Sequence, residues 1–228
     1  MTSQSPTPHL FVAGATGVVG TEVVRQAHAL QVSVTPHLRP SRAKAGHEWA
    51  THSSAAILEL SDQAALVSAL RGHTAVLQLI GTMRKRFKTG DTYQTSDIDT
   101  TRYLVEAARK AGVPHMVILT AVGAGRPVGA YMRAKAEAER LVVESGLGYT
   151  IVRPSSFMGG PHKPPPGMES GLALLGKLGF RTLDERLRPI AVADLARAIL
   201  YAGMEQGPGN HVLEGATLWA QVERSRQK

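Results

Sequence analysis

Short apolar runs alternate with longer amphipathic segments along most of the chain. The first apolar run, at 9–14, precedes a helical pattern at 16–30. Further runs of strand length lie at 32–38, 55–60, 74–81, 115–120, 149–154 and 211–215, and further helical patterns lie at 61–72, 92–112, about 129–146 and 192–204. A run such as TAVLQLIG lacks polar alternation, as strands do when helices cover both faces of their sheet. The pattern therefore predicts an α/β fold of the doubly wound class, a parallel sheet with helices on both faces.

The rhythm of the chain changes after Pro154. Residues 155–171 are rich in Gly and Pro, which interrupt regular structure, and loops of this length serve as lids or binding walls or are disordered. We expect residues 155–185 to form a lid or small C-terminal lobe beside a substrate, although the leucines of 171–180 would also fit core packing. The 228 residues show no internal repeat and predict one domain, with residues 1–8 as a flexible tail.

The composition excludes several kinds of site. The chain has no cysteine, which rules out disulfides, thiolate nucleophiles and cysteine-bound zinc and is compatible with a reducing compartment. Its nine histidines show no spacing typical of metal ligands, so we expect no metal site. No apolar run approaches the roughly 20 residues that span a bilayer, and MTSQSPTPH lacks the basic and apolar regions of a signal peptide. These features predict a cytoplasmic protein that does not use a membrane.

The net charge of +8 favours anionic partners, which include nucleic acid, acidic membranes and phosphate-bearing small molecules. A basic cluster follows the fourth predicted strand and consists of Arg84, Lys85, Arg86 and Lys88. Loops at the carboxyl ends of parallel strands border the ligand crevice, so this cluster would steer an acidic cofactor or substrate, unless it is simply solvated. Only Phe87 is available to stack on a base, and no nucleic-acid-binding motif is present. A small-molecule substrate is therefore favoured over nucleic acid.

Glycines at three-residue intervals join the first predicted strand to the first predicted helix, in the segment VAGATGVVG. Their G-x-x-G-x-x-G spacing differs by one residue from the G-x-G-x-x-G of common dinucleotide-binding turns. A turn without β-carbons lets backbone amides approach a pyrophosphate, and the following helix points its positive N-terminus at that anion. We expect cofactor contacts from Gly14, Thr16, Gly17, Val18 and Gly20; the alternative is a tight turn with a structural role only.

The end of the second predicted strand carries basic residues where an NAD-type site carries an acid. That acid binds the 2′-hydroxyl of the adenosine ribose. Here no acid occurs before Glu48, and the segment contains Arg39, Arg42 and Lys44 instead. Because guanidinium groups suit a 2′-phosphate, we expect Arg39 and Arg42 to bind one. NADP(H) is therefore favoured over NAD(H), unless these residues form a solvated basic turn.

Several motifs in a fixed order resemble the atypical short-chain dehydrogenase/reductases, which are NAD(P)-binding Rossmann proteins and include the NmrA-like group. The motifs are FVAGATGVVG, LQLIGTMRKRFKTG, TSDIDTTRYLVEAARKAGVPHMVILTAVGAG, AYMRAKAEAE, YTIVRPSSFMGG and PIAVADLARAI. They run through most of the chain, and their order and spacing are more specific than any one motif. The resemblance implies a Rossmann fold and a nicotinamide dinucleotide cofactor.

The resemblance assigns the chemistry to a Tyr-x-x-x-Lys pair. Tyr131 and Lys135 lie one turn apart on a predicted helix. In this family the tyrosine exchanges a proton with the substrate oxygen, and the lysine stabilises the phenolate and binds the nicotinamide ribose. Thr120 would polarise the same oxygen, although relatives often have two serines where this chain has Thr120 and Ala121. Asp97 stands where many relatives have an Asn that supports a proton relay.

The resemblance also implies cofactor contacts at the ends of other strands. Gly81 and Thr82, after the fourth strand, would lie beside the riboses. Leu60, after the third strand, would lie near the adenine, and Pro154 near the nicotinamide carboxamide. These positions complete the set of expected cofactor contacts.

Three functions fit these observations. The favoured one is an NADP(H)-dependent oxidoreductase that transfers a hydride between nicotinamide and a small carbonyl, alcohol or quinone-like substrate. The second is a non-catalytic NADP(H)-binding, redox-sensing regulator, suggested by the departures at Ala121 and Asp97. The third, a nucleic-acid-binding module, rests on net charge alone. The sequence leaves the oligomeric state open between a monomer and a homodimer.

Overall fold

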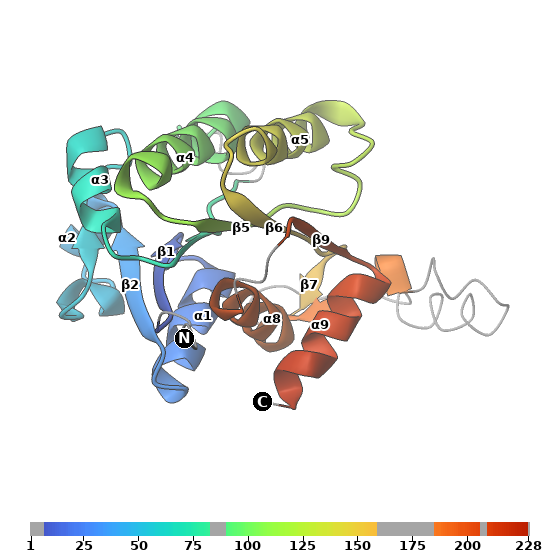
Figure 1. Cartoon of the computed structure of the whole chain (residues 1–228). Coiled ribbons are helices and arrows are strands. Elements are labelled where there is room, and N and C mark those ends of the chain that lie inside the picture. Colours follow the sequence, from blue (N-terminus) through green and yellow to red (C-terminus); the bar gives the residue numbers. More distant parts are fainter. Residues whose placement is uncertain (1–6, 83–89, 159–184, 206–208, 228) are drawn as a thin grey trace, which may run out of the picture.

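A seven-stranded parallel sheet forms the centre of the molecule (Figure 1). The computed structural model describes residues 7–82, 90–158, 185–205 and 209–227. The strands are β1 (His9–Ala13), β2 (Ser33–Leu38), β3 (Ala56–Ile57), β4 (Ala75–Gln78), β5 (His115–Leu119), β6 (Gly148–Arg153) and β9 (His211–Glu214). They pair in the order β3-β2-β1-β4-β5-β6-β9, and every pair is parallel. β7 (Phe157–Met158) and β8 (Ile190–Ala191) form a separate parallel pair.

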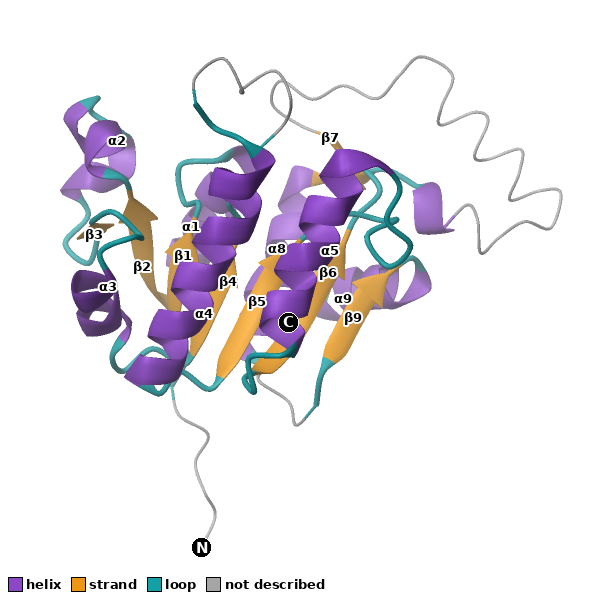
Figure 2. Ribbon diagram, turned by 90° about the horizontal axis from the view of Figure 1, so that it is seen from above, coloured by secondary structure: helices purple, strands orange, loops and turns teal. Residues whose placement is uncertain are grey.

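Helices cover both faces of the sheet, which confirms the doubly wound α/β class (Figures 1 and 2). One face carries α1 (Val18–Ala29), α8 (Val192–Met204) and α9 (Ala216–Arg226), and the other carries α3 (Gln63–Leu70), α4 (Thr100–Ala111) and α5 (Gly129–Val143). The short helix α2 (Pro40–Lys44) and a 3₁₀ turn at Glu48–Thr51 follow β2, and a π-helix at Gln94–Asp99 runs directly into α4.

The interior strand β1 contributes side chains to both halves of the hydrophobic core. Its side chains alternate across the sheet, as in any strand. Leu10 and Val12 pack into the cluster beneath α1 and α8, whereas Phe11 and Ala13 pack into the cluster beneath α3 and α4. All four are fully buried, and burial of a Leu or Phe side chain contributes about 1.5–3 kcal/mol. This two-sided burial explains the unbroken apolar run in the sequence.

Local signals in the sequence explain where two helices begin or end. The Asp62 carboxylate accepts a hydrogen bond from the Ala65 amide (3.0 Å) and so caps the N-terminus of α3. Gly112 ends α4 with φ of 75°, a left-handed conformation that suits glycine. The predicted stop of this helix at Gly112 is confirmed.

Several predicted boundaries were wrong, and two α-helices in the described ranges were not predicted. The helix predicted at 92–112 begins with the π-helix, and the strand predicted at 55–60 is limited to β3. The strand predicted at 74–81 stops at Gln78. The Ile80 amide donates a hydrogen bond to the Gln78 side chain (3.1 Å) and not to a neighbouring strand. The missed helices are α2 and α9; the latter buries Leu218 and Val222, spaced by one helical turn, beside α8.

The lid predicted at 155–185 falls mostly on residues 159–184, which lie outside the described residues. The basic cluster Arg84–Lys88 and residues 1–6 of the predicted tail lie outside them as well. The described flanks of the lid segment are joined: the Ser155 hydroxyl donates to the Arg188 carbonyl (2.9 Å), and the Ile190 amide donates to the Ser156 carbonyl (3.0 Å). The described residues 155–156 and 188–190 therefore lie side by side.

The described residues also bear on two kinds of partner. None of the helices in these ranges is long and apolar enough to cross a membrane. In the same ranges, no group of three or more His, Cys, Asp or Glu side chains is arranged to hold a metal ion.

Buried histidines should make the fold sensitive to acid. The pKa of His37, His73 and His115 is lowered from 6.5 to about 4, mainly by burial. Arg39 contributes to the lowering at His37, and neighbouring histidines contribute at the other two. The unfolded chain therefore binds more protons than the folded chain between these values, so the stabilising contribution is present above pH 6.5 and is lost as the pH falls toward 4. We expect a loss on the order of 1–3 kcal/mol per histidine. Urea unfolding at pH 7.5, 6 and 5 measures it, and equal free energies of unfolding at all three would contradict it.

Candidate functional site

The strand order reverses direction between β1 and β4, and the loops that follow these two strands lie side by side. Chain order runs outward from β1 to β2 and β3 on one side, and from β4 to β5 and β6 on the other. In open α/β sheets, ligands bind in the crevice outside the carboxyl ends of the strands at such a switch point.

The glycine turn after β1 approaches the backbone after β4 closely. Gly14 has φ of 92°, and a β-carbon there would lie 2.9 Å from the Leu79 carbonyl carbon. A β-carbon on Gly20 would lie 2.1 Å from the Gly14 carbonyl oxygen, so the first turn of α1 packs directly on the loop. The Gly17 amide donates to the Gly14 carbonyl (2.9 Å) and closes the turn. Larger residues would separate these backbones.

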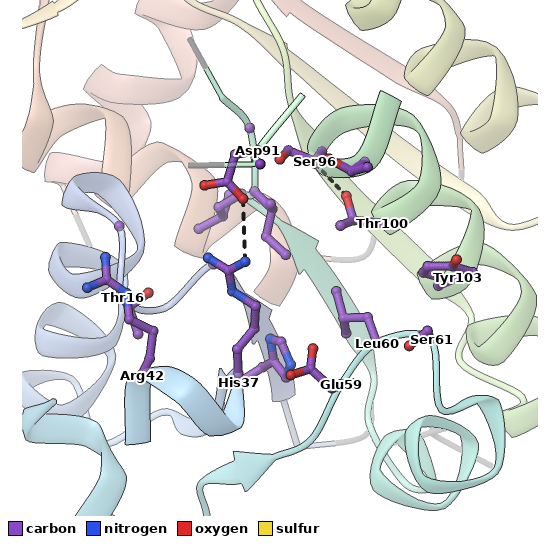
Figure 3. A pocket seen from close by; sticks show the side chains of 18 residues that line it. Thr16, His37, Arg42, Glu59, Leu60, Ser61, Asp91, Ser96, Thr100 and Tyr103 are labelled. Carbon is purple, nitrogen blue, oxygen red and sulfur yellow. Dashed lines mark hydrogen bonds and ion pairs between the residues drawn. The ribbon is translucent and has the colours of Figure 1, made fainter. Parts of the chain in front are cut away.

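A cavity of about 420 Å³ opens at this switch point (Figure 3), within the usual size range of small-molecule sites. We call it the switch-point cavity. The predicted cofactor contacts that line it are Gly14, Thr16, Gly17, Arg39, Arg42, Leu60 and Gly81. They come from the loops after four different strands, so the fold brings together residues that are up to 67 positions apart in the sequence (81 − 14).

The other predicted cofactor contacts are not among the lining residues. Val18 and Gly20 belong to α1, where Val18 is 38% exposed and Gly20 packs on Gly14. Thr82 is buried, and its amide donates to Asp97 (3.3 Å). Pro154 is buried, and its carbonyl accepts the Val122 amide (2.9 Å). Lys135 lies next to the lining residue Gly81, as described below. For all five of these residues, direct contact with the cofactor remains a prediction.

The charges where the loops after β2 and β3 line the cavity are mixed. The Arg39 guanidinium lies 3.4 Å from the Asp91 carboxylate, an ion pair drawn in Figure 3 between two lining residues. Glu59 adds a second lining carboxylate. Within the described ranges Arg42 has no ion-pair partner, and burial lowers the pKa of His37 to about 4, which leaves its imidazole neutral. Arg42 is therefore the lining cation most available to an incoming anion.

Tyr131 and Lys135 lie one turn apart on α5, as predicted, and both face other groups of the site. The Tyr131 ring is half-buried, with its centroid 5.5 Å from that of Tyr93 and 5.7 Å from Lys135 Nζ. Lys135 Nζ lies 2.7 Å from Asp97 Oδ1. A β-carbon on Gly81 would lie 2.7 Å from Lys135 Nζ, so this ammonium lies next to a residue that lines the switch-point cavity.

The π-helix that carries Asp97 is held in place by side chains of β4 and α4. The Thr100 and Thr101 hydroxyls donate to the carbonyls of Ser96 and Asp97 (both 2.6 Å). The buried Gln78 amide in turn donates to both hydroxyls (3.1 and 3.0 Å). π-Helices occur often at functional sites. Here the π-helix fixes Asp97 against Lys135 and contributes Ser96 to the cavity wall.

Thr120 is committed to a buried ion network. Its hydroxyl donates to Glu139 Oε1 (2.6 Å), which also accepts from Arg153 Nε (2.9 Å). Arg153 reaches Glu214 on β9 as well (3.1 Å), and Glu214 pairs with Arg186. The Thr120 hydroxyl therefore donates its proton to a carboxylate, and its role toward a substrate oxygen stays a prediction.

Sequence reasoning missed several residues of the site, although some signals were present. Glu139 follows Tyr131 and Lys135 at the same four-residue spacing, so it lies on the face of α5 that turns toward the sheet. A carboxylate on a buried face needs a partner, and Arg153, at the end of an apolar strand, is a cation that could pair with it. The missed cavity residues carry no comparable signal; they include Glu59, Asp91, Thr95, Ser96, Thr100 and Tyr103.

Comparisons with known proteins agree with this geometry. Residues 14–202 match the model of the NAD(P)H-binding family. A (4-alkanoyl-5-oxo-2,5-dihydrofuran-3-yl)methyl phosphate reductase of Streptomyces griseus is 33% identical over 193 residues, which cover 82% of this chain and 62% of that protein. An NAD(P)H azoreductase of Xenophilus azovorans is 29% identical over 150 residues, which cover 65% of this chain and 48% of that protein. The chain thus spans less than two thirds of either relative.

A solved structure shares the fold. MoeE5 in complex with UDP-glucose and NAD superposes with a TM-score of 0.67 at 20% sequence identity, covering 96% of this chain and 81% of MoeE5. The family match covers most of the chain and includes the glycine turn, the switch-point cavity and the Tyr131–Lys135 pair. The chain therefore belongs to the NAD(P)H-binding family, a Rossmann-fold family consistent with its resemblance to the atypical short-chain dehydrogenase/reductases.

Proposed function

We propose that this protein is an NADP(H)-dependent oxidoreductase. It transfers a hydride between nicotinamide and a small carbonyl, alcohol or quinone-like substrate. The observation that carries the proposal is the position of Gly81. It lines the switch-point cavity, and a β-carbon on it would lie 2.7 Å from Lys135 Nζ. A dinucleotide cavity and a Tyr-x-x-x-Lys pair therefore meet at one residue. The two reductase relatives support the same class of chemistry.

The chain's own residues would divide the work as follows. The backbone amides of the glycine turn and the N-terminus of α1 would hold the pyrophosphate. Lys135 would donate hydrogen bonds to the nicotinamide ribose. The bound nicotinamide would supply a hydride to the substrate carbon, which reduces the carbonyl and oxidises the cofactor. Tyr131 would donate its phenolic proton to the substrate oxygen, so that a carbonyl leaves as an alcohol.

The preference for NADP(H) rests on the two arginines of the cavity. Arg42 has an accessible guanidinium, and Arg39 would exchange its 3.4 Å contact with Asp91 for a 2′-phosphate. Such an exchange replaces an exposed ion pair, which contributes little, with a charge-assisted contact to a dianion. The two arginines therefore favour NADP(H) over NAD(H), with Arg42 as the stronger contributor.

A second function, a redox-sensing NADP(H)-binding regulator without catalysis, is favoured by one observation. The Thr120 hydroxyl, expected to polarise the substrate, is bonded to Glu139 instead. A panel of aldehydes, ketones, quinones and azo compounds with excess NADPH distinguishes the two functions. Oxidation of NADPH by any member supports the enzyme. Saturable NADPH binding without turnover of any member supports the regulator.

The remaining expectations about the protein's setting stay predictions: a cytoplasmic location, a small-molecule substrate without nucleic acid, and either a monomeric or a homodimeric state. Retention on DNA measured against salt concentration tests the nucleic-acid alternative, because phosphate contacts give a steep salt dependence.

A further inference from the structure

The most deeply buried ion pair beside the switch-point cavity joins Lys135 to Asp97. The side chains are 7% and 1% exposed, and Nζ lies 2.7 Å from Oδ1. The second carboxylate oxygen, Oδ2, accepts the Thr82 amide (3.3 Å). Two charges so fully removed from water are retained only when each compensates the other, because either one alone would be strongly destabilising.

Asp97 cannot easily move away from Lys135. Its backbone carbonyl is tied to the Thr101 hydroxyl, and Thr101 is tied to Gln78 at the end of β4. The carboxylate is thus fixed by the π-helix and by the central sheet at the same time. These bonds therefore hold the Asp97 carboxylate at a distance from which it compensates the Lys135 charge.

The pair borders the cavity at Gly81. A β-carbon on Gly81 would lie 2.7 Å from Lys135 Nζ and 3.2 Å from Asp97 Oδ1. Both charges therefore act on any ligand group that passes Gly81, and in the low-dielectric surroundings of buried side chains they act strongly. An ammonium alone would repel a cationic ligand group there, and the neighbouring carboxylate removes most of that repulsion.

We propose that Asp97 is a positioning residue that neutralises Lys135 and thereby sets the balance between oxidised and reduced cofactor in the site. This inference rests on the proposed function, because it takes the Tyr131–Lys135 pair as the nicotinamide end of the cavity. The oxidised nicotinamide ring is cationic and the reduced ring is neutral. With Asp97 in place, the ammonium of Lys135 does not exclude NADP⁺, and both forms of the cofactor bind.

The test is the ratio of two dissociation constants, that of NADP⁺ divided by that of NADPH, measured by titration without turnover. Asp97→Asn should raise the ratio about tenfold, the order expected when one unit charge several Å away is no longer compensated. Lys135→Met should shift the ratio in the opposite direction, because the carboxylate then attracts the cation. The double variant D97N/K135M should return the ratio to near the wild-type value.

A matched control is Asp99→Asn, an acid-to-amide change in the same π-helix. Asp99 pairs with Arg102 at 2.9 Å rather than with Lys135. The ratio of the two dissociation constants in this variant should therefore equal that of the wild type. A purely structural Asp97 would weaken both forms equally, and an unchanged ratio in D97N overturns the inference. Should D97N fail to fold, the other two variants carry the test. The ratio should fall in K135M and return to near the wild-type value in D97N/K135M. If neither change is seen, the inference is overturned. Failure of the wild-type chain to bind either form overturns the proposed function itself.

Discussion

Substitution of Tyr131 by phenylalanine should lower turnover by about 100- to 10,000-fold, the usual contribution of a positioned acid or base. The change removes one oxygen from a half-buried ring that packs at 5.5 Å from Tyr93 and lies beside Lys135. The ring itself stays, so the packing and the cavity are preserved. The affinity for NADPH should therefore change little. Steady-state kinetics with any substrate found in the panel, together with an NADPH titration, measures both quantities.

The matched control for this variant is Tyr149→Phe. Tyr149 lies near the start of β6, at the opposite end of the sheet from the crevice, and packs in the core with a partly buried ring. Loss of its hydroxyl should leave turnover unchanged. Normal turnover by the Tyr131 variant would show that the proton comes from another group, and the proposed role of Tyr131 would then be wrong.

Substitution of Arg153 by alanine should lower the free energy of unfolding by about 3–5 kcal/mol, the cost of leaving one member of a buried ion pair without its partner. Arg153 contacts Glu139 and Glu214, and its side chain is 16% exposed while that of Glu139 is 7% exposed. Without the guanidinium, Glu139 keeps only the Thr120 hydroxyl as a partner in this network. Urea-induced unfolding followed by circular dichroism measures the loss.

Arg186→Ala serves as the comparison for the Arg153 variant. Arg186 pairs with the same Glu214, but half of its side chain is exposed to solvent. An exposed ion pair contributes about 0–1 kcal/mol, so this variant should be close to wild type. Similar small losses in both variants would mean that burial does not govern the strength of the network.

The architecture could be predicted because its signals are local. The apolar run of β1, the glycines after it and the stop at Gly112 each lie within a few residues of the structure that they specify. The same holds for the four-residue spacing of Tyr131 and Lys135 on α5. Strand–helix alternation then restricts the sheet to few topologies.

The chemistry of the site could be predicted only in part because its contacts are tertiary. Arg39 meets Asp91 across 52 positions, and Arg153 meets Glu214 across 61. The partner of the Thr120 hydroxyl is set by how α5 packs on β5, which no local pattern encodes. The π-helix could not be predicted for a similar reason, because it is held by Gln78, a residue of another element. Several residues of the site could therefore be predicted from the sequence, but the residues that they contact could not.

The most direct test of this account is a calorimetric titration of the full chain with NADPH and with NADH. We expect saturable heat for one NADPH per chain and weaker binding of NADH. Arg42→Ser should lower NADPH affinity roughly 10- to 100-fold, as expected when a charged hydrogen bond is removed. NADH affinity should be nearly the same in that variant. Absence of heat from well-folded protein with both dinucleotides would contradict the central claim that the switch-point cavity holds a nicotinamide cofactor.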